Sequence, residues 1–395
     1  MESKLRGLGI KFTLLMVTTI GSLLVCEFLV RWFQPQDLNG TCLGYVEGGL
    51  SVNKAGGSAR HQFKRRVVVY RFNEYHLRGE PIGPGRNRVL CVGDSCTFGW
   101  LVDEQYTYVR RLGVLAEAAC APGTFEFLNG GTGGWGTADY VAYVEDFGPS
   151  LKPQVVVAFL DFDDARRSIA SNLYSLDLKN GLLHRNYYSL TFSQKAKQFA
   201  RDLPAYQWLL EHSHLLQVFR HAMAKLPSTK SQTVSPLSPT DNEGLGNGLR
   251  LEHSLFLRLN EWCRAHDAHF LVVGIDCFFQ PRTGEASEQV NAAFLAQARD
   301  FFERAGIPYR DLALDYSPSV DGDLASNSIP GDSHLNERGH ELVAQLTWKW
   351  LGPQLRTLYC PQKAQGGAGS VRTPEQLNRH LFLEINCYLP ASICL

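Results

Sequence analysis

The sequence has no excess of charge of either sign and only one long apolar run, and each absence excludes a class of protein. Its 395 residues carry 39 Lys and Arg against 39 Asp and Glu, with no dominant basic block. Nucleic acid is therefore not expected as a partner. A single apolar run excludes a multi-pass transporter or channel. There is no internal repeat and no Cys-x-x-Cys metal pair among the ten cysteines.

The apolar run lies at the N-terminus and predicts a membrane anchor. Residues 12–30 give nineteen positions, which at 1.5 Å per residue match the roughly 30 Å of hydrocarbon in a bilayer. Three Lys and Arg residues precede the run against a single acid, so the positive-inside rule places the N-terminus in the cytoplasm. Glu27 and Arg31 are spaced to pair near the outer end.

Two alternatives to an uncleaved anchor fit the residues less well. A cleaved signal peptide needs a small-x-small site, which Val25-Cys26-Glu27 does not provide. A lipoprotein site at Cys26 needs a small residue before it, and Val25 is too large. We therefore expect a single-pass anchor over residues 1–33 and a linker over 34–64. The rest of the chain would lie on the periplasmic, extracytoplasmic side of the cytoplasmic membrane.

That location permits disulfides, although the cysteine spacing fixes none. Cys360, Cys387 and Cys394 cluster in the tail, where a bridge could form among them. Cys91 and Cys277 lie in apolar, strand-like runs and are interpreted as buried small hydrophobic residues.

Short apolar runs alternate with helical patterns from residue 88 onward. Fully apolar strands separated by helices predict a parallel sheet covered on both faces. We therefore expect a three-layer α/β/α sandwich over residues 65–355. The expected strands of its sheet are residues 89–92, 125–128, 155–160 and 270–275, with a short fifth strand from 307, and a further strand-like run, 66–70, precedes them.

Two segments interrupt or follow this domain. An insertion over about residues 172–250 combines a helical stretch, 193–226, with a loop rich in Ser, Pro, Gly and Asn, 227–248. We interpret it as a lid or a surface for partners. A tail over residues 356–395 includes a linker-like Gly-rich stretch.

Unusual residues follow three of the predicted strands, where ligands bind in open α/β sheets. Ser95 stands at a strand-to-helix turn, near the positive end of the following helix. His334, just before the last helix, could take its proton, and Asp332 could hold the imidazole tautomer. The backbone amides of Ser95 and Gly134 could donate to an oxyanion. The pattern predicts nucleophilic catalysis.

These features also have purely structural alternatives. Ser95 could only cap a helix, and the glycines of 130–136 could only form a tight turn, whose spacing does not match a dinucleotide loop. Segment 211–214 carries two histidines on a helix, where they are usually solvated, so no metal is expected. Arg166 and Arg167 could bind an anionic substrate, but we interpret them as a solvated helix start.

Three blocks resemble those of the SGNH/GDSL esterase and acyl-hydrolase superfamily. They are Gly93-Asp94-Ser95 with Thr97 and Gly99, then Asn129, Gly131 and Gly134, and last Asp332-x-His334 with Asn336. The resemblance implies a serine hydrolase without a cofactor, with Ser95 as nucleophile, His334 as base and Asp332 as its orienting partner. The segment 73–79 and the single anchor resemble membrane-tethered bacterial members.

The third strand departs from the family pattern. The family carries an Asn there as a third oxyanion donor, and this chain has Asp163, followed by Asp164. A carboxylate cannot donate, and losing one donor costs about 10²–10³ in kcat. Asp163 could instead be kept protonated by an apolar site and by Asp164, and so donate. Trp135 could line the acyl or sugar pocket, or could only pack.

The expected activity is cleavage or transfer of an ester-linked acyl group. The expected substrate is an acylated envelope polysaccharide or a lipid, and the lipid bilayer is the second partner through the N-terminal helix. The alternative is a catalytically weakened or inactive protein that kept the fold and binds glycan.

Overall fold

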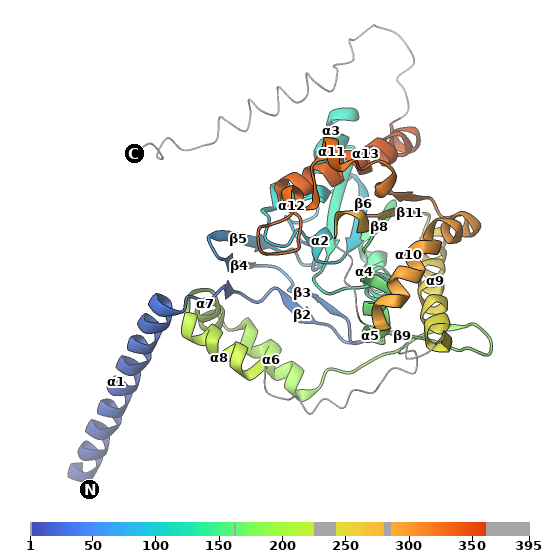
Figure 1. The fold of residues 1–395 in the computed structure, drawn as a ribbon. Helices are drawn as coiled ribbons and strands as arrows, with labels where there is room; N and C mark the ends of the chain where they lie inside the picture. The colour runs from blue at the N-terminus through green and yellow to red at the C-terminus, as the bar shows by residue number, and fades with distance from the viewer. Residues whose placement is uncertain (1, 162, 225–241, 280–285, 361–395) are drawn as a thin grey trace, which may run out of the picture.

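The computed structural model describes residues 2–161, 163–224, 242–279 and 286–360, and a five-stranded parallel sheet forms its centre (Figure 1). The strand order is β12-β11-β8-β6-β7. The chain therefore reverses its direction of travel across the sheet between β7 and β8, which is where ligands bind in such folds. The strands are β6 (Asn87–Gly93), β7 (Phe125–Gly131), β8 (Val155–Leu160), β11 (His269–Gly274) and β12 (Tyr309–Asp311).

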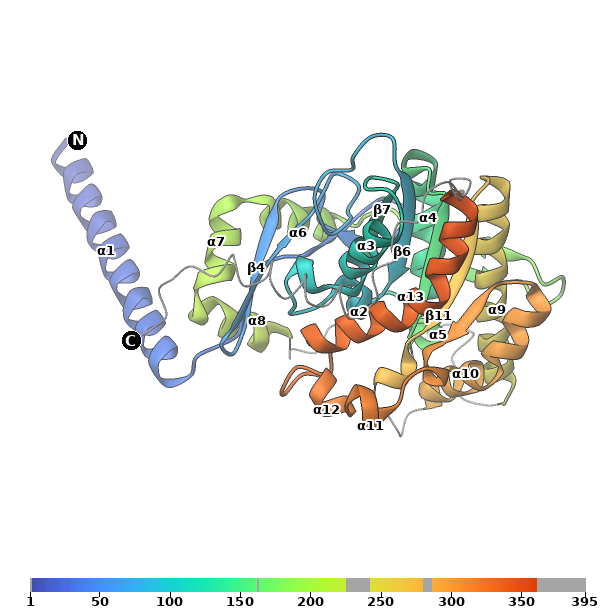
Figure 2. The same cartoon turned by 90° about the horizontal axis from the view of Figure 1, so that it is seen from above.

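Helices cover both faces of this sheet, so the predicted three-layer α/β/α fold is confirmed (Figure 2). All six residues of β8 are buried. Val156 and Ala158 face one helical layer, whereas Val155, Val157 and Phe159 face the other. The first layer is α4 (Thr137–Leu151), α9 (Asn242–Ala265) and α10 (Ala286–Ala305), and the second is α3 (Tyr108–Ala119) and α13 (Glu337–Tyr359).

Short helices complete the loops around the sheet. They are α2 (Ser95–Phe98), α5 (Asp164–Ser171), α11 (Pro318–Asp321), α12 (Leu324–Asn327) and the 3-10 turns η1 (Glu104–Tyr106), η2 (Asp276–Phe278) and η3 (Leu312–Leu314). Cys91 is buried in β6, as predicted, but Cys277 lies in η2 beyond the strand and is only partly buried.

The N-terminal helix α1 (Glu2–Phe33) projects away from the rest of the molecule in both views (Figure 1, Figure 2). Its segment Gly9–Phe33 is long and apolar enough to cross a membrane, a criterion that a signal sequence would also meet.

The predicted linker over residues 34–64 is wrong, because this segment forms strands. β1 (Leu38–Asn39) and β4 (Ser58–Phe63) pair with β5 (Arg66–Arg71) in an antiparallel sheet, hereafter the small sheet. β2 (Leu43–Tyr45) and β3 (Ser51–Asn53) form a hairpin. The strands of 34–64 are mostly two or three residues long, too short for a period of two to show in the sequence.

The insertion also differs in detail from its prediction. A hairpin of β9 (Tyr174–Leu176) and β10 (Leu183–Arg185) precedes three helices, α6 (Phe192–Asp202), α7 (Pro204–His212) and α8 (His214–Ala224). The predicted single helical stretch breaks where Pro204 begins a new helix. Residues from 242 onward are helical although a loop was predicted there, and 225–241 lie outside the described residues.

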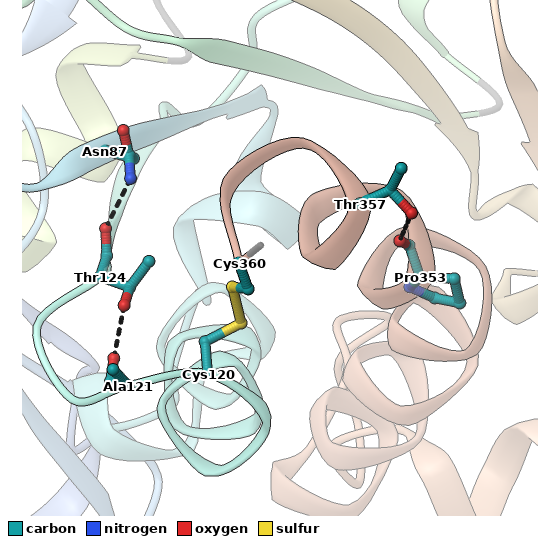
Figure 3. Close-up of a disulfide and its surroundings, with 7 residues drawn as sticks. All are labelled: Asn87, Cys120, Ala121, Thr124, Pro353, Thr357 and Cys360. Carbon is teal, nitrogen blue, oxygen red and sulfur yellow. Dashed lines mark hydrogen bonds between the residues drawn. A yellow bond between two sulfur atoms is a disulfide. The ribbon is translucent and has the colours of Figure 1, made fainter. Parts of the chain in front are cut away.

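A disulfide joins Cys120, at the end of α3, to Cys360, at the end of α13 (Figure 3). The two helices pack against the same face of the sheet, which brings residues 240 positions apart to a Cα–Cα distance of 6.2 Å. A bridge from Cys360 to another tail cysteine is therefore wrong. Cys387 and Cys394 lie outside the described residues.

Candidate active site

Ser95, His334 and Asp332 form one chain of hydrogen bonds at the carboxyl edge of the sheet. Ser95 Oγ lies 2.9 Å from His334 Nε2, and His334 Nδ1 lies 2.5 Å from Asp332 Oδ1. The backbone N–H of His334 donates to the same Asp332 oxygen at 2.8 Å. This is the order of a Ser-His-Asp triad. The three residues that the sequence singled out are thus brought together.

Close packing of the turn after β6 presents Ser95 to solvent. Every residue from Cys91 to Gly99 is buried except Ser95. A Cβ on Gly93 would lie 1.8 Å from Thr97 Oγ1, and one on Gly131 would lie 2.2 Å from Phe98 N. Only glycine at these two positions lets α2 sit directly on the ends of β6 and β7.

The loop that carries His334 is held by the cap of α13. The Asn336 side chain accepts from Gly339 N at 3.0 Å and donates to the carbonyls of Ser326 and Ser328, each at 2.9 Å. Asn336 thus ties the start of α13 to the segment before His334. The spacing Asp-x-His-x-Asn places base, orienting acid and cap on one short loop.

Asp332 is charged in this arrangement. Partial burial opposes its ionisation, but the hydrogen bonds from the side chain and amide of His334 outweigh burial and lower the pKa of Asp332. An Asp332 carboxylate fixes the proton of His334 on Nδ1, which leaves Nε2 free to accept from Ser95.

The two backbone amides predicted as oxyanion donors are free of protein acceptors. The N–H groups of Ser95 and Gly134 have no hydrogen-bond acceptor among the described residues. Gly134 has a φ of +84°, and a Cβ there would meet nothing within 4 Å. These two amides are available to stabilise negative charge on a substrate oxygen.

Asp163 is not a third donor, and the protonated form considered above is not supported. It is 3% exposed, and its two oxygens accept from Arg166 Nε at 2.6 Å and Arg167 Nε at 2.9 Å. Asn291 Nδ2 lies 3.5 Å from Asp163 as well. Because guanidinium groups donate to both of its oxygens, Asp163 acts as an acceptor in this arrangement.

Arg167 is a site residue that sequence reasoning missed, since Arg166 and Arg167 were interpreted as solvated. Arg167 Nη1 donates to Asp94 Oδ2 at 2.7 Å and to the carbonyl of Trp135 at 3.1 Å. Ser95 Oγ lies 3.3 Å from the same Asp94 oxygen. A positive charge therefore lies one carboxylate away from the candidate nucleophile.

Asp94 belongs to a buried cluster of acids that Arg167 organises. Burial opposes ionisation of Asp94, but the charge of Arg167 and several hydrogen bonds lower its pKa. Burial raises the pKa values of Asp161 and Asp164 well above the ordinary value of an Asp, and the charge of Asp94 raises them further. Asp94 thus carries the negative charge of the cluster and pairs with Arg167.

The same cluster contains the one candidate metal group among the described residues, and its chemistry does not suit a cation. The ligand atoms of Asp94, Cys96 and Asp161 lie within 4.8 Å of one another. Burial keeps the pKa of the Cys96 thiol well above its ordinary value, and Arg167 already pairs with Asp94. A metal ion could bind here only if the Cys96 thiol lost its proton and the ion pair between Asp94 and Arg167 were broken.

Trp135 packs inside the protein and does not line an open pocket. It is 2% exposed, its ring lies 5.3 Å from that of Tyr143, and its Nε1 donates to the carbonyl of Ser51 at 2.5 Å. Of the two alternatives for Trp135, the structure favours packing, and the substrate-binding prediction is not supported.

The aromatic ring beside the base is instead Trp100. Its ring centroid lies 6.2 Å from that of His334 and 4.3 Å from that of His61, a residue of β4 in the small sheet. Trp100 is only partly buried. Its place directly after the block around Ser95 was the signal that could have identified it.

No family model and no curated protein matches this chain. Its structure is similar to that of a protein described as lipolytic, of the G-D-S-L family, from Desulfitobacterium hafniense DCB-2, with 12% identity and a TM-score of 0.38 over 67% of this chain and 98% of that one. It is also similar to the psychrotrophic esterase EstA from Pseudoalteromonas sp., with 11% identity and a TM-score of 0.37 over 68% and 99%. A catalytic mutant of Axe2, an acetylxylan esterase from Geobacillus stearothermophilus, gives 13% identity and a TM-score of 0.36 over 69% and 97%. We rest no functional conclusion on similarities this distant.

Proposed function

We propose that this chain is a membrane-anchored serine hydrolase that acts on ester bonds. The observation that carries the proposal is the hydrogen-bond chain from Ser95 through His334 to Asp332, at 2.9 and 2.5 Å. A serine in this relay, together with two backbone amides that have no acceptor among the described residues, has the parts that acyl transfer requires.

In the proposed reaction, each of these residues has a separate role. Ser95 Oγ attacks the ester carbonyl while His334 Nε2 takes its proton, and Asp332 stabilises the imidazolium that forms. The amides of Ser95 and Gly134 donate to the oxyanion of the tetrahedral intermediate. His334 then protonates the leaving alcohol, which leaves an acyl group on Ser95. Water, or the hydroxyl of an acceptor, attacks that acyl-enzyme as His334 takes its proton. His334 then returns the proton to Ser95 Oγ as the bond between Ser95 and the acyl carbon breaks, which releases or transfers the acyl group and regenerates the serine.

We place the catalytic domain outside the cytoplasmic membrane, with α1 as the anchor. The Cys120–Cys360 disulfide supports this side, because disulfides persist in oxidising compartments. The substrate class we propose is an acylated envelope polysaccharide or a lipid, as the three sequence blocks imply.

The test uses the full chain in detergent with p-nitrophenyl acetate and a fluorophosphonate probe. We expect wild type to hydrolyse the ester and to be labelled at Ser95. Ser95→Ala should lose both signals, and Asp332→Asn should lower kcat by about 10⁴ through the wrong tautomer of His334. Ser254→Ala, on α9, is the matched control and should behave as wild type. Labelling that survives Ser95→Ala would refute the proposed nucleophile.

A weakened, glycan-binding protein is the second candidate, and Asp163 is the observation that favours it. Without a third donor the rate should be about 10²–10³ lower than with one. Asp163→Asn tests whether the carboxylate limits the rate, and the fluorophosphonate label separates the two candidates. If the carboxylate limits a working site, the Asn variant gains activity. We expect no gain, because residue 163 is oriented toward Arg166 and Arg167. A folded wild type that takes no fluorophosphonate label would favour the binding protein.

A further inference from the structure

Helices α7 and α8 turn their polar side chains toward the protein. Gln207, Glu211 and His214 accept hydrogen bonds from backbone N–H groups next to or within the small sheet, those of Thr41, Arg60 and Gln36, at 3.2, 2.9 and 2.8 Å. Gln217 is buried and donates to the carbonyl of Leu210 at 2.6 Å. The covered side of this helix pair is therefore largely polar.

The opposite side is apolar and exposed. Trp208 is 60% exposed, Phe219 66% and Met223 56%, and Leu209 is exposed as well. A helix on the surface of a protein in water has the reverse arrangement, with apolar residues inside. A contiguous exposed apolar surface marks a site of contact with another apolar phase or partner. We call these four residues, with Leu215 and Leu216, the α7–α8 apolar face.

This face is continuous with the candidate membrane span. Glu27 of α1 accepts from Ser213 Oγ at 2.8 Å, from His214 N at 3.0 Å and from Leu215 N at 2.9 Å. Arg31 donates to the carbonyl of His212 at 2.7 Å. Four hydrogen bonds thus fix the start of α8 against the outer part of α1, which Figure 1 shows as neighbours.

On the N-terminal side of Glu27, helices α1 and α8 face each other across an apolar groove. Leu23 and Leu24 of α1 line it on one side, and Leu216 and Phe219 of α8 line it on the other. The groove has a volume of about 730 Å³. Leu23 and Leu24 lie inside the segment long enough to cross a membrane. The side chains opposite them must then lie at a similar depth.

We propose that the α7–α8 apolar face lies in the outer leaflet of the lipid bilayer, beside α1, with lipid acyl chains filling the groove. Trp208 suits the boundary between headgroups and acyl chains, where Trp is enriched. An amphipathic helix with its apolar face in the acyl boundary is a known mode of membrane association. This proposal goes beyond the ester chemistry and does not depend on it.

The test places a fluorophore on the face and asks which phase surrounds it. The full chain carries Phe219→Cys or Met223→Cys labelled with nitrobenzoxadiazole. Cys26→Ser removes the exposed free thiol among the described residues, and Cys387→Ser and Cys394→Ser remove the two tail thiols. The labelled chain is reconstituted in vesicles of three parts phosphatidylcholine to one part phosphatidylglycerol. Val320→Cys, an exposed apolar position on α11, is the matched control.

We expect blue-shifted emission at both α8 positions, quenched by nitroxide-labelled lipid and shielded from aqueous iodide. The control should show red-shifted emission that iodide quenches. Iodide quenching at residues 219 and 223 in vesicles would overturn the proposal. If the same positions were shielded only in native membranes, a protein partner would cover the face instead of lipid. Esterase activity, measured on the same samples, reports separately on the proposed function.

Discussion

Ser95 and Arg167 approach the same carboxylate, Asp94, from two sides. Ser95 Oγ and Arg167 Nη1 lie 3.3 and 2.7 Å from Asp94 Oδ2. Asp94 also accepts from Cys96 N at 2.7 Å and so caps α2. The residue before the nucleophile is thus a buried charge, and Arg167 is its counterion. We infer that Arg167 positions the turn that presents Ser95.

Removing the guanidinium group of Arg167 should lower the stability of the folded protein. We expect Arg167→Met to lower the free energy of unfolding by about 3–5 kcal/mol, because it leaves a buried carboxylate unpaired. Urea unfolding of the full chain in detergent measures this. Arg310→Met breaks a more exposed pair with Asp315 and should cost no more than about 1 kcal/mol. Equal losses in the two variants would contradict the positioning role of Arg167.

His340 gives a prediction for pH. Its Nδ1 accepts from Tyr108 N at 3.2 Å, and burial, then the charge of Arg78, lowers its pKa to about 3. Between that value and about 6.5 the unfolded chain binds a proton at this residue and the folded chain does not. The free energy of unfolding should therefore fall as the pH is lowered from about 7, by up to about 1.4 kcal/mol per unit from this group.

Other groups titrate in the same range, so the informative quantity is a difference between two chains. We expect His340→Gln, which keeps an acceptor for Tyr108 N, to lose stability less steeply than wild type between about pH 7 and pH 4.5. Urea titrations at several pH values give both slopes. Parallel slopes would show that residue 340 is not buried as a neutral imidazole.

Among elements, the loop between α12 and α13 decides whether His334 reaches Ser95. Its Asn336 caps α13 and also holds two carbonyls of the preceding segment. Asn336→Ala should cost about 0.5–2 kcal/mol of stability, as cap removal usually does, and should also lower kcat by displacing His334.

Thr191→Ala is the control for this effect. It removes the side-chain cap of α6, which lies away from the triad, so it should affect stability without lowering kcat. Circular dichroism with urea and the p-nitrophenyl acetate assay measure the two quantities. If Asn336→Ala kept full kcat, the cap would have no role in placing the base.

The sequence could predict the elements whose structure depends on residues close together in the chain. Four fully or mostly apolar runs predicted four strands of the central sheet. The residues after two of them predicted Ser95 and Gly134, and the block before the last helix predicted His334. Arg167 could not be found in this way, because its partner Asp94 lies far away in the sequence and only the fold makes the pair. The periodicity of α7 and α8 likewise indicates two faces but not which of them the protein covers.

For the whole molecule, the Cys120–Cys360 bridge closes a long loop that contains His334 and four of the five strands of the central sheet, but not β6 or Ser95 (Figure 3). The double variant Cys120→Ser, Cys360→Ser should lower the free energy of unfolding by about 2–5 kcal/mol. Its kcat at low temperature should stay at the wild-type value, because the bridge lies at the ends of α3 and α13, away from the turn that presents Ser95. Urea unfolding in detergent tests this, with Cys26→Ser as the control.

The small sheet stands between the α7–α8 apolar face and the triad. On one side α7 is hydrogen-bonded to β4 through Glu211 and Arg60. On the other side His61 of β4 meets the ring of Trp100 edge to face, next to His334. If the α7–α8 apolar face lies in lipid, the small sheet fixes the distance between the membrane surface and Ser95. A lipid ester would have to leave the bilayer by that distance to reach Ser95. A polysaccharide outside the membrane could react only at ester groups that lie at the same distance from the bilayer. The distance of an ester from the bilayer would then decide which esters are cut, before any pocket selects among them.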